Sequence, residues 1–128
     1  MTTEKNILVV DDEEDLRYAV QQILKSRGFA VKTASSGVEA LGILEFGYVP
    51  DLVITDQDMP GMKGMKLVEE IHKSQQVPCV LMSGNEHFRE IFEDNPDAQK
   101  QKGLAGFLVK PVLMQRLFAV VGQIISKP

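Results

Sequence analysis

The 128-residue sequence contains no tryptophan, one cysteine and no long hydrophobic run. The single cysteine, Cys79, cannot form an internal disulfide, and its place in the apolar segment 77–82 indicates a small buried side chain. No apolar run approaches the roughly 20 residues that span a bilayer, and the opening MTTEKN lacks the apolar centre of a signal peptide. These absences argue against a disulfide-stabilised or membrane-inserted domain, and we expect a cytoplasmic protein.

Clustered positive charge is also missing. The 14 lysines and arginines are outnumbered by 18 acidic residues, and no basic stripe with interleaved aromatic residues is present. A net charge of −4 offers little electrostatic support for direct nucleic-acid binding. With 44% hydrophobic residues, the chain is long enough for one domain with its own core and too short for two. We therefore expect one domain over residues 1–128 without an effector domain, although a linker to a further module could begin at 126–128.

Short apolar runs of strand length alternate with segments of helical periodicity. The runs lie at 7–10, 52–55, 77–82 and 105–109, and the segment 29–34 shows the period of two expected of a further strand, with Lys32 suited to a sheet edge. Apolar residues recur at helical spacing within 16–24, 38–44, 65–71, 88–92 and 113–124. In the second of these helices, Val38, Leu41 and Leu44 are expected to face inward. Such alternation implies right-handed crossovers, and the predicted fold is α/β: a doubly wound five-stranded parallel sheet, built from a βα unit repeated five times, with helices on both faces.

Polar side chains follow four of the five predicted strands. Asp11 and Asp12 follow the first strand, Asp56 the third, Ser83 the fourth and Lys110 the fifth. Each residue alone would suit a helix cap, a turn or a solvated surface. Together they would meet at one edge of a parallel sheet, where ligands collect outside the carboxyl ends of the strands. The sequence therefore predicts a polar site centred on Asp56.

The chemistry of these residues indicates phosphoryl transfer. Three crowded carboxylates repel one another and are costly to assemble unless a cation lies among them. Mg²⁺ prefers oxygen ligands and commonly binds one or two carboxylates together with phosphate oxygens, so we expect Asp11 and Asp12 to hold it. Asp56 can then attack phosphorus as a carboxylate nucleophile. Lys110 would neutralise the moving phosphoryl group, and Ser83 would donate a hydrogen bond to it.

Five short segments carry a resemblance to a known family. VVDDE at 9–13, ITD at 54–56 with MPG at 59–61, MSG at 82–84 and FLVKP at 107–111 resemble the receiver domain of two-component response regulators, which has a flavodoxin-like fold. The resemblance covers the whole chain. It implies the following roles: Asp56 as phosphoacceptor, Asp11, Asp12 and Asp56 as ligands of Mg²⁺ with the backbone carbonyl of Asp58, Ser83 and Lys110 as phosphoryl-binding residues, Phe107 as switch aromatic, and Lys110-Pro111 as a cis peptide.

The same resemblance implies a function and its partners. The chain would be a phosphorylation-dependent signalling switch that receives its phosphoryl group from a sensor histidine kinase or a histidine phosphotransfer protein. Phosphorylation would alter the face formed by the fourth helix, fifth strand and fifth helix, which would bind a downstream protein or, in a phosphorylation-dependent homodimer, a second copy. Such a protein is not an enzyme, beyond self-phosphorylation from small donors and autodephosphorylation.

Several residues depart from the family pattern. Gln57 stands where the family usually has an apolar or aromatic residue, and Lys63 replaces an aspartate that would cap the following helix. Asp58 adds a fourth acid beside the acceptor, and we hypothesise that Asp58 and Asn85 tune the lifetime of the phosphoryl group. The segment 86–103 is longer than usual, either as a tolerated surface insertion or as a partner surface. After a break at Asn95, its polar part is expected to be irregular.

Three other functions would also use some of these residues. A haloacid-dehalogenase-like phosphohydrolase would use Asp56 as nucleophile and Asp58 as general acid and base, but a cap domain and an acidic pair after the lysine are missing. A receiver-like module that binds its partner without phosphorylation would not need the acceptor, acidic pair, hydroxyl and lysine, which are all present. An FMN-binding flavodoxin-like module would need a hydroxyl- and glycine-rich phosphate loop after the first strand, where this sequence has none.

Overall fold

The computed structural model describes residues 4–125, which form one parallel sheet of five strands together with six helices. The strands are β1 (Asn6–Val10), β2 (Ala30–Ala34), β3 (Leu52–Asp56), β4 (Cys79–Ser83) and β5 (Leu104–Val109). The helices are α1 (Glu14–Ser26), α2 (Gly37–Glu45), α3 (Gly64–His72), α4 (Glu86–Asp94), α5 (Pro96–Gln101) and α6 (Met114–Ile124). None of these helices is long and apolar enough to cross a membrane. The outer ends of the expected domain and the expected linker start at 126–128 lie outside the described residues.

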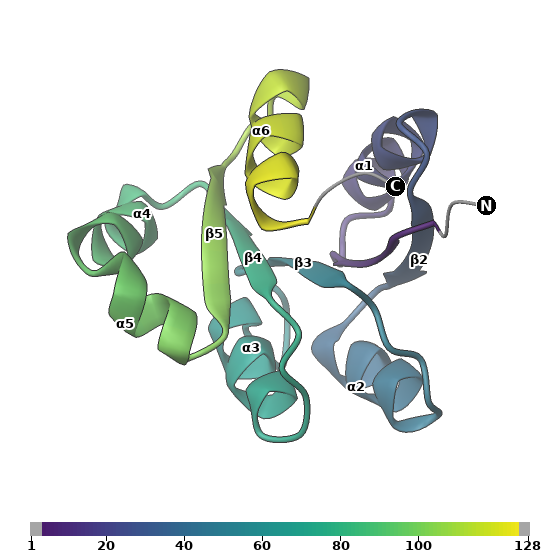
Figure 1. Cartoon of the computed structure of the whole chain (residues 1–128), viewed down its shortest axis with the longest axis horizontal. Coiled ribbons are helices and arrows are strands. Elements are labelled where there is room, and N and C mark those ends of the chain that lie inside the picture. Colours follow the sequence, from purple (N-terminus) through teal and green to yellow (C-terminus); the bar gives the residue numbers. More distant parts are fainter. Residues whose placement is uncertain (1–3, 126–128) are drawn as a thin grey trace.

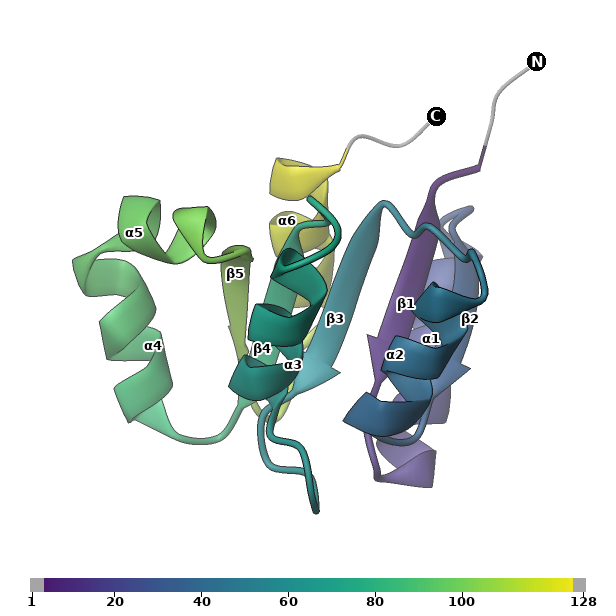
Figure 2. The same ribbon diagram turned by 90° about the horizontal axis from the view of Figure 1, so that it is seen from below.

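The strands are arranged in the order β2-β1-β3-β4-β5, so the crossovers change direction between β1 and β3. α1 and α6 cover one face of the sheet, and α2 and α3 cover the opposite face (Figure 1; Figure 2). This arrangement confirms the predicted doubly wound parallel fold. It also explains why the runs in β1, β3 and β4 are continuously apolar, since helices bury both faces of these strands.

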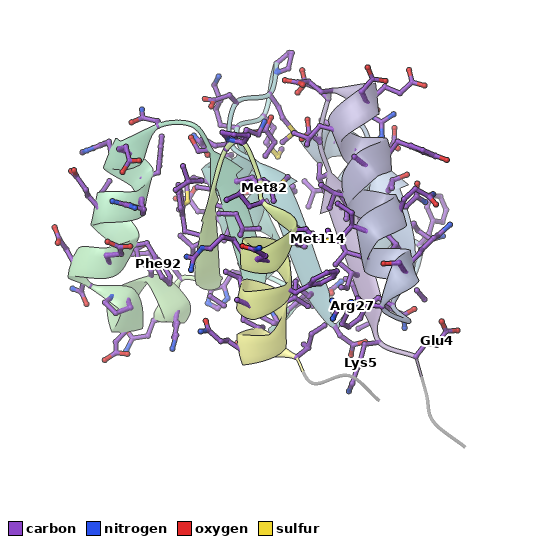
Figure 3. The ribbon with its side chains drawn as sticks, turned by 90° about the horizontal axis from the view of Figure 1, so that it is seen from above. Glu4, Lys5, Arg27, Met82, Phe92 and Met114 are labelled. Carbon is purple, nitrogen blue, oxygen red and sulfur yellow. The ribbon has the colours of Figure 1, made fainter. Side chains whose placement is uncertain are left out.

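Side chains of each central strand alternate between two cores. Ile7 and Val9 lie in the core that α1 and α6 cover, whereas Leu8 and Val10 lie in the core that α2 and α3 cover. Met82 of β4, labelled in Figure 3, belongs to the first of these cores. Because the strands are held from both sides, the positions of their carboxyl ends are fixed relative to one another.

The segment between β4 and β5 differs from the prediction. The sequence predicts an irregular stretch after Asn95, but these residues form α5, so the described chain has six helices rather than five. The Asn95 side chain accepts a hydrogen bond from the Ala98 N–H (3.3 Å), and Pro96 occupies the first turn. An Asn-Pro pair can therefore start a helix as well as end one, since both residues suit a helix N-terminus. α4 and α5 lie beside the free edge of β5 (Figure 1).

The inward face of α2 agrees with the prediction at Leu44, which is buried, and at Leu41, which packs against the core, but not at Val38. Val38 is 71% exposed, whereas Gly37, Ala40 and Leu44 are buried. A Cβ at Gly37 would lie 2.8 Å from the sulfur of Met62 in the β3–α3 loop, so the absence of a side chain permits close contact here. This contact turns the face at i, i+3 and i+7 inward and leaves Val38 in solvent.

Candidate functional site

Asp11, Asp12 and Asp56 lie at neighbouring strand ends. β1 and β3 pair directly in the sheet, and the three residues each offer a carboxylate oxygen within 4.8 Å of the others. Asp11 and Asp56 are buried, whereas Asp12 is exposed. The cluster lies where the crossovers change direction, the usual ligand position in an open parallel sheet. Asp11 and Asp56 are 45 positions apart in the chain, and the pairing of β1 with β3 brings their carboxylates together.

Lys110 follows β5 and reaches the same cluster. Its Nζ lies 2.9 Å from Asp56 Oδ1 and 3.9 Å from Asp11 Oδ2. The Lys110-Pro111 peptide bond is cis. The backbone N–H of Lys110 donates a hydrogen bond to the Ser83 carbonyl (3.0 Å). Lys110 is therefore connected both to the carboxylates and to the end of β4.

Ser83 and its neighbours border the cluster from β4 and β5. The buried Ser83 hydroxyl accepts a hydrogen bond from the Asn85 N–H (3.0 Å), and the Asn85 side chain accepts one from the His87 N–H (2.9 Å) at the start of α4. Phe107 of β5 is buried in the core that α2 and α3 cover. Asp58 is exposed in the loop after β3. Asn85 thus links the end of β4 to α4, whereas Asp58 stands apart from these hydrogen bonds.

Hydrogen bonds fix the backbone around Asp11. Its Oδ1 accepts a hydrogen bond from the Glu13 N–H (2.9 Å), and the Arg17 guanidinium donates one to its carbonyl (2.8 Å). The Asp11 N–H donates to the carbonyl of Ala34 at the end of β2 (3.1 Å). Arg17 was not among the predicted site residues. Its place in the first turns of α1, two residues after the acidic run at 11–15, is the signal that would have identified it.

The carboxylates carry more negative charge than Lys110 balances. Burial raises the pKa of Asp11 to about 6; the charges of Asp56 and Asp12 act in the same direction, and the Glu13 N–H and Lys110 oppose them. For Lys110, burial alone would lower the pKa, but the close contact of its ammonium with Asp56 and the charges of the nearby carboxylates outweigh burial and raise the pKa. Lys110 therefore stays charged, and Asp11 lacks a full countercharge.

The donor set fits a divalent cation. Asp11 Oδ2 and Asp56 Oδ1 are buried and have no hydrogen bond of ordinary geometry, although the Lys110 ammonium faces both. Carboxylate oxygens are the ligands that Mg²⁺ prefers, and a divalent charge would relieve the repulsion that raises the pKa of Asp11. The residues present at this edge of the sheet are thus suited to Mg²⁺ by both ligand type and charge.

Comparison with known proteins accounts for this arrangement. A family model described as a response regulator receiver domain matches residues 7–122. The chain belongs to this family of receiver domains. Receiver domains are phosphorylation-dependent signalling switches rather than classical enzymes, and they bind Mg²⁺ at an acidic pocket, which here corresponds to the cluster of Asp11, Asp12 and Asp56. The resemblance and the switch function predicted from the sequence are thereby confirmed, and the phosphohydrolase alternative receives no support.

Relatives of this receiver domain include segments of longer proteins. The chain is 35% identical over 123 residues to the sensor kinase CckA of Brucella abortus, covering 94% of the chain and 12% of that protein. It is 36% identical over 109 residues to the regulator of RpoS of Escherichia coli, covering 84% of the chain and 31% of that protein. The chain therefore spans less than a third of either relative.

Solved structures share the whole fold. A response regulator receiver domain protein from Clostridium thermocellum is 30% identical, with a TM-score of 0.80 and 94% of both chains covered. The response regulator TrrA from Thermotoga maritima, solved in complex with Mg²⁺ and BeF, is 31% identical with a TM-score of 0.79, covering 94% of this chain and 99% of that chain. The match extends across the whole receiver fold in both cases.

Proposed function

We propose that Asp56 of this receiver domain accepts a phosphoryl group from a sensor histidine kinase or a histidine phosphotransfer protein. The observation that carries the proposal is the Asp56 carboxylate: it is buried, its Oδ1 has no hydrogen bond of ordinary geometry, and Lys110 Nζ lies 2.9 Å from that oxygen. A carboxylate fixed opposite an ammonium can attack phosphorus while the developing charge is already compensated. The relationship to a sensor kinase and to response regulators supports this class of donor.

In the proposed step, a carboxylate oxygen of Asp56 bonds to phosphorus while the phosphorus–nitrogen bond of the donor phosphohistidine breaks. The electron pair of that bond leaves with the imidazole. Lys110 holds its ammonium against the transferred group, and the Ser83 hydroxyl turns from the Asn85 N–H to donate to a phosphoryl oxygen.

The proposed metal ligands are Asp11, Asp12, Asp56 and the backbone carbonyl of Asp58. Mg²⁺ bound there would compensate negative charge on the phosphoryl oxygens. Unmet acceptor capacity at Asp11 Oδ2 and Asp56 Oδ1 supports this assignment. The similar TrrA protein, solved with Mg²⁺ and BeF, supports it independently.

The proposed output face consists of α4, β5 and α6, the last being the fifth helix of the predicted βα repeat. A groove of about 650 Å³ runs between these elements, with Phe92, Phe107 and Arg116 among its lining residues. Phe92 extends from α4 toward β5 (Figure 3). Because Phe107 lies in the same groove and in the strand that precedes Lys110, a shift of this ring would change the face that a downstream protein or a second copy binds.

A direct test is intact-mass analysis after incubation with a small phosphodonor. The wild type should gain one phosphoryl group in the presence of Mg²⁺ and none in excess chelator, and Asp56→Asn should gain none. Self-phosphorylation and autodephosphorylation are measured in the same samples over time. Catalytic release of phosphate without a phosphorylated protein, or labelling of Asp56→Asn, would contradict the proposal.

We also propose that Asp58 and Asn85 tune the lifetime of the phosphoryl group. Asp58 is exposed two residues after the acceptor, and Asn85 is hydrogen-bonded both to Ser83 and to the first turn of α4. A change at either position would alter the approach of water to the phosphoryl group. An unchanged half-life in Asp58→Asn and in Asn85→Ala would refute this role.

We further propose that residues 1–128 form one receiver domain.

A further inference from the structure

The helix that follows the phosphoacceptor begins without a local cap. Lys63 occupies the N-cap position of α3 with extended backbone angles (φ −72°, ψ 157°), and no side-chain hydrogen bond caps the helix there. A lysine side chain has no acceptor, whereas helix N-caps normally use the oxygen of Ser, Thr, Asp or Asn. The first turn of α3 also contains no acidic residue. The N–H groups at the start of α3 must therefore find their acceptors elsewhere.

Gln57, the residue directly after Asp56, supplies these acceptors. Its side-chain Oε1 accepts a hydrogen bond from the Met65 N–H (2.8 Å), and its backbone carbonyl accepts one from the Gly64 N–H (3.1 Å). Its own N–H donates to the Met82 carbonyl of β4 (2.8 Å). Gln57 is 7% exposed, so these hydrogen bonds are sheltered from competing water. One buried polar residue thus joins the end of β3, the start of α3 and β4.

The start of α3 is packed directly on the phosphoacceptor backbone. A Cβ at Gly64 would overlap the carbonyl oxygen of Asp56 and would lie 2.8 Å from a methyl carbon of Leu81. The intervening loop, residues 57–63, contains Asp58, whose carbonyl is the proposed backbone ligand of Mg²⁺. Any movement of the first turn of α3 therefore reaches both the Asp56 backbone and this loop.

We infer that Gln57 is a positioning residue: its side chain replaces the missing cap of α3 and thereby fixes the loop that presents Asp56 and Asp58. The departures at Gln57 and Lys63 are then linked. The N-cap residue Lys63 supplies no acceptor, and Gln57 at the end of β3 supplies one in its place. The inference rests on the proposed roles of Asp56 and Asp58. It accounts for a polar residue at a buried position where the family pattern has an apolar one.

The experiment measures Mg²⁺ binding by titration calorimetry in the absence of any phosphodonor. Gln57→Met keeps the volume of the side chain and removes its oxygen, so the loop must become ordered when the metal binds. We expect the dissociation constant of Mg²⁺ to rise about five-fold, the effect of one lost cap. Lys63→Ser in the same protein restores an acceptor at the N-cap, and the double variant should return to within about two-fold of the wild type.

A matched pair of variants separates the cap from the charge. Lys63→Gln removes the same positive charge as Lys63→Ser but provides a poor N-cap. Gln57→Met with Lys63→Gln should therefore stay weak in Mg²⁺ binding. Equal rescue by serine and glutamine would overturn the inference, because charge alone would then explain the recovery.

Two further measurements separate positioning from stability and from the proposed function. Asn95→Ala removes a comparable cap from α5, outside the site, and should leave the dissociation constant of Mg²⁺ unchanged. The inference is wrong if Asn95→Ala weakens Mg²⁺ as much as Gln57→Met does, or if Gln57→Met binds Mg²⁺ like the wild type. Mass analysis of the same proteins with a phosphodonor tests the proposed function separately: an unphosphorylated wild type would refute the acceptor role of Asp56, whereas the Mg²⁺ titrations would still decide the role of Gln57.

Discussion

Two regions of the molecule differ in how tightly they are packed. The site at the carboxyl ends of the strands is firmly held, whereas the segment that carries α4 and α5 is loosely held. Asp11, Asp56 and Ser83 are buried, and backbone hydrogen bonds tie the loops around them. In α4 no residue is buried, and Ile91 is 41% exposed. Phosphoryl transfer needs groups that are already in position, whereas an output surface must be able to change its packing. If α4 belongs to the output face, as proposed, the molecule separates these two requirements in space.

Ser83 and Asn85 connect the two regions. The Ser83 carbonyl accepts the Lys110 N–H, and the Ser83 hydroxyl accepts the Asn85 N–H. Asn85 in turn caps α4 through the His87 N–H. If the hydroxyl turns toward a phosphoryl group, the hydrogen bond to Asn85 is lost at the point where α4 begins. A firmly held site can therefore act on a loosely held helix through one side chain.

The largest expected contrast between the regions is in stability. Leu81→Ala removes a fully buried side chain of β4 and should lower the free energy of unfolding by about 2–5 kcal/mol. Ile91→Ala on α4 removes a side chain that is half in solvent and should lower it by less than about 1 kcal/mol. Urea unfolding followed by circular dichroism measures both. Equal losses would mean that α4 is as firmly packed as the sheet.

A second contrast lies within the site, between the buried carboxylate of Asp11 and the exposed carboxylate of Asp12. Asp11→Asn removes one of three crowded carboxylates and should stabilise the metal-free protein by about 1 kcal/mol, because burial and like charge oppose the ionised form of Asp11. Mg²⁺ should raise the midpoint of unfolding of the wild type but have little effect on this variant. Asp12→Asn is the control, since Asp12 is exposed and should give a smaller gain without metal. A destabilised metal-free Asp11→Asn would contradict this account.

The firmly held region is also the one that the sequence predicts best. Asp56 and Ser83 end buried strands, and Asp11 and Lys110 directly follow β1 and β5. Because parallel pairing brings the strand ends to one edge, the local sequence pattern and the position in the fold agree. The loosely held region offers no such constraint. The sequence Asn95-Pro96 is compatible with both the end and the start of a helix. The hydrogen bond from the Ala98 N–H to the Asn95 side chain decides between them.

Side-chain contacts that depend on the path of a loop also cannot be predicted from the sequence pattern. The hydrogen bond between Gln57 and the Met65 N–H joins residues eight positions apart across a turn whose path no periodicity specifies. The orientation of Val38 depends on the contact between Gly37 and Met62, which lies in another loop. Strand ends follow from the fold class, whereas these contacts follow from the path of individual loops.

A smaller effect is expected at the start of α5. Asn95→Ala removes the acceptor of the Ala98 N–H and should increase amide hydrogen exchange in α5 about five-fold, the effect of one lost N-cap. Exchange of the β3 amides should remain unchanged, because these amides open only when the sheet unfolds. Exchange measured by mass spectrometry on peptides from both regions tests this. Faster exchange in β3 would show that the two regions open together.

The smallest effect is expected for the ion pairs on α4. Arg89 lies 3.0 Å from Glu86 and 3.8 Å from Glu93, and all three side chains are largely exposed, so solvent screens the attraction. Arg89→Gln should change the free energy of unfolding by less than about 0.5 kcal/mol. Lys110→Gln is the informative partner variant, because it removes the ammonium that faces the buried Asp11 and Asp56 oxygens and should weaken the metal-free protein more. Urea unfolding in the presence of chelator measures both changes in the free energy of unfolding. A larger loss of stability for Arg89→Gln than for Lys110→Gln would mean that the exposed ion pairs on α4 contribute more to stability than the buried ion pairs of the site.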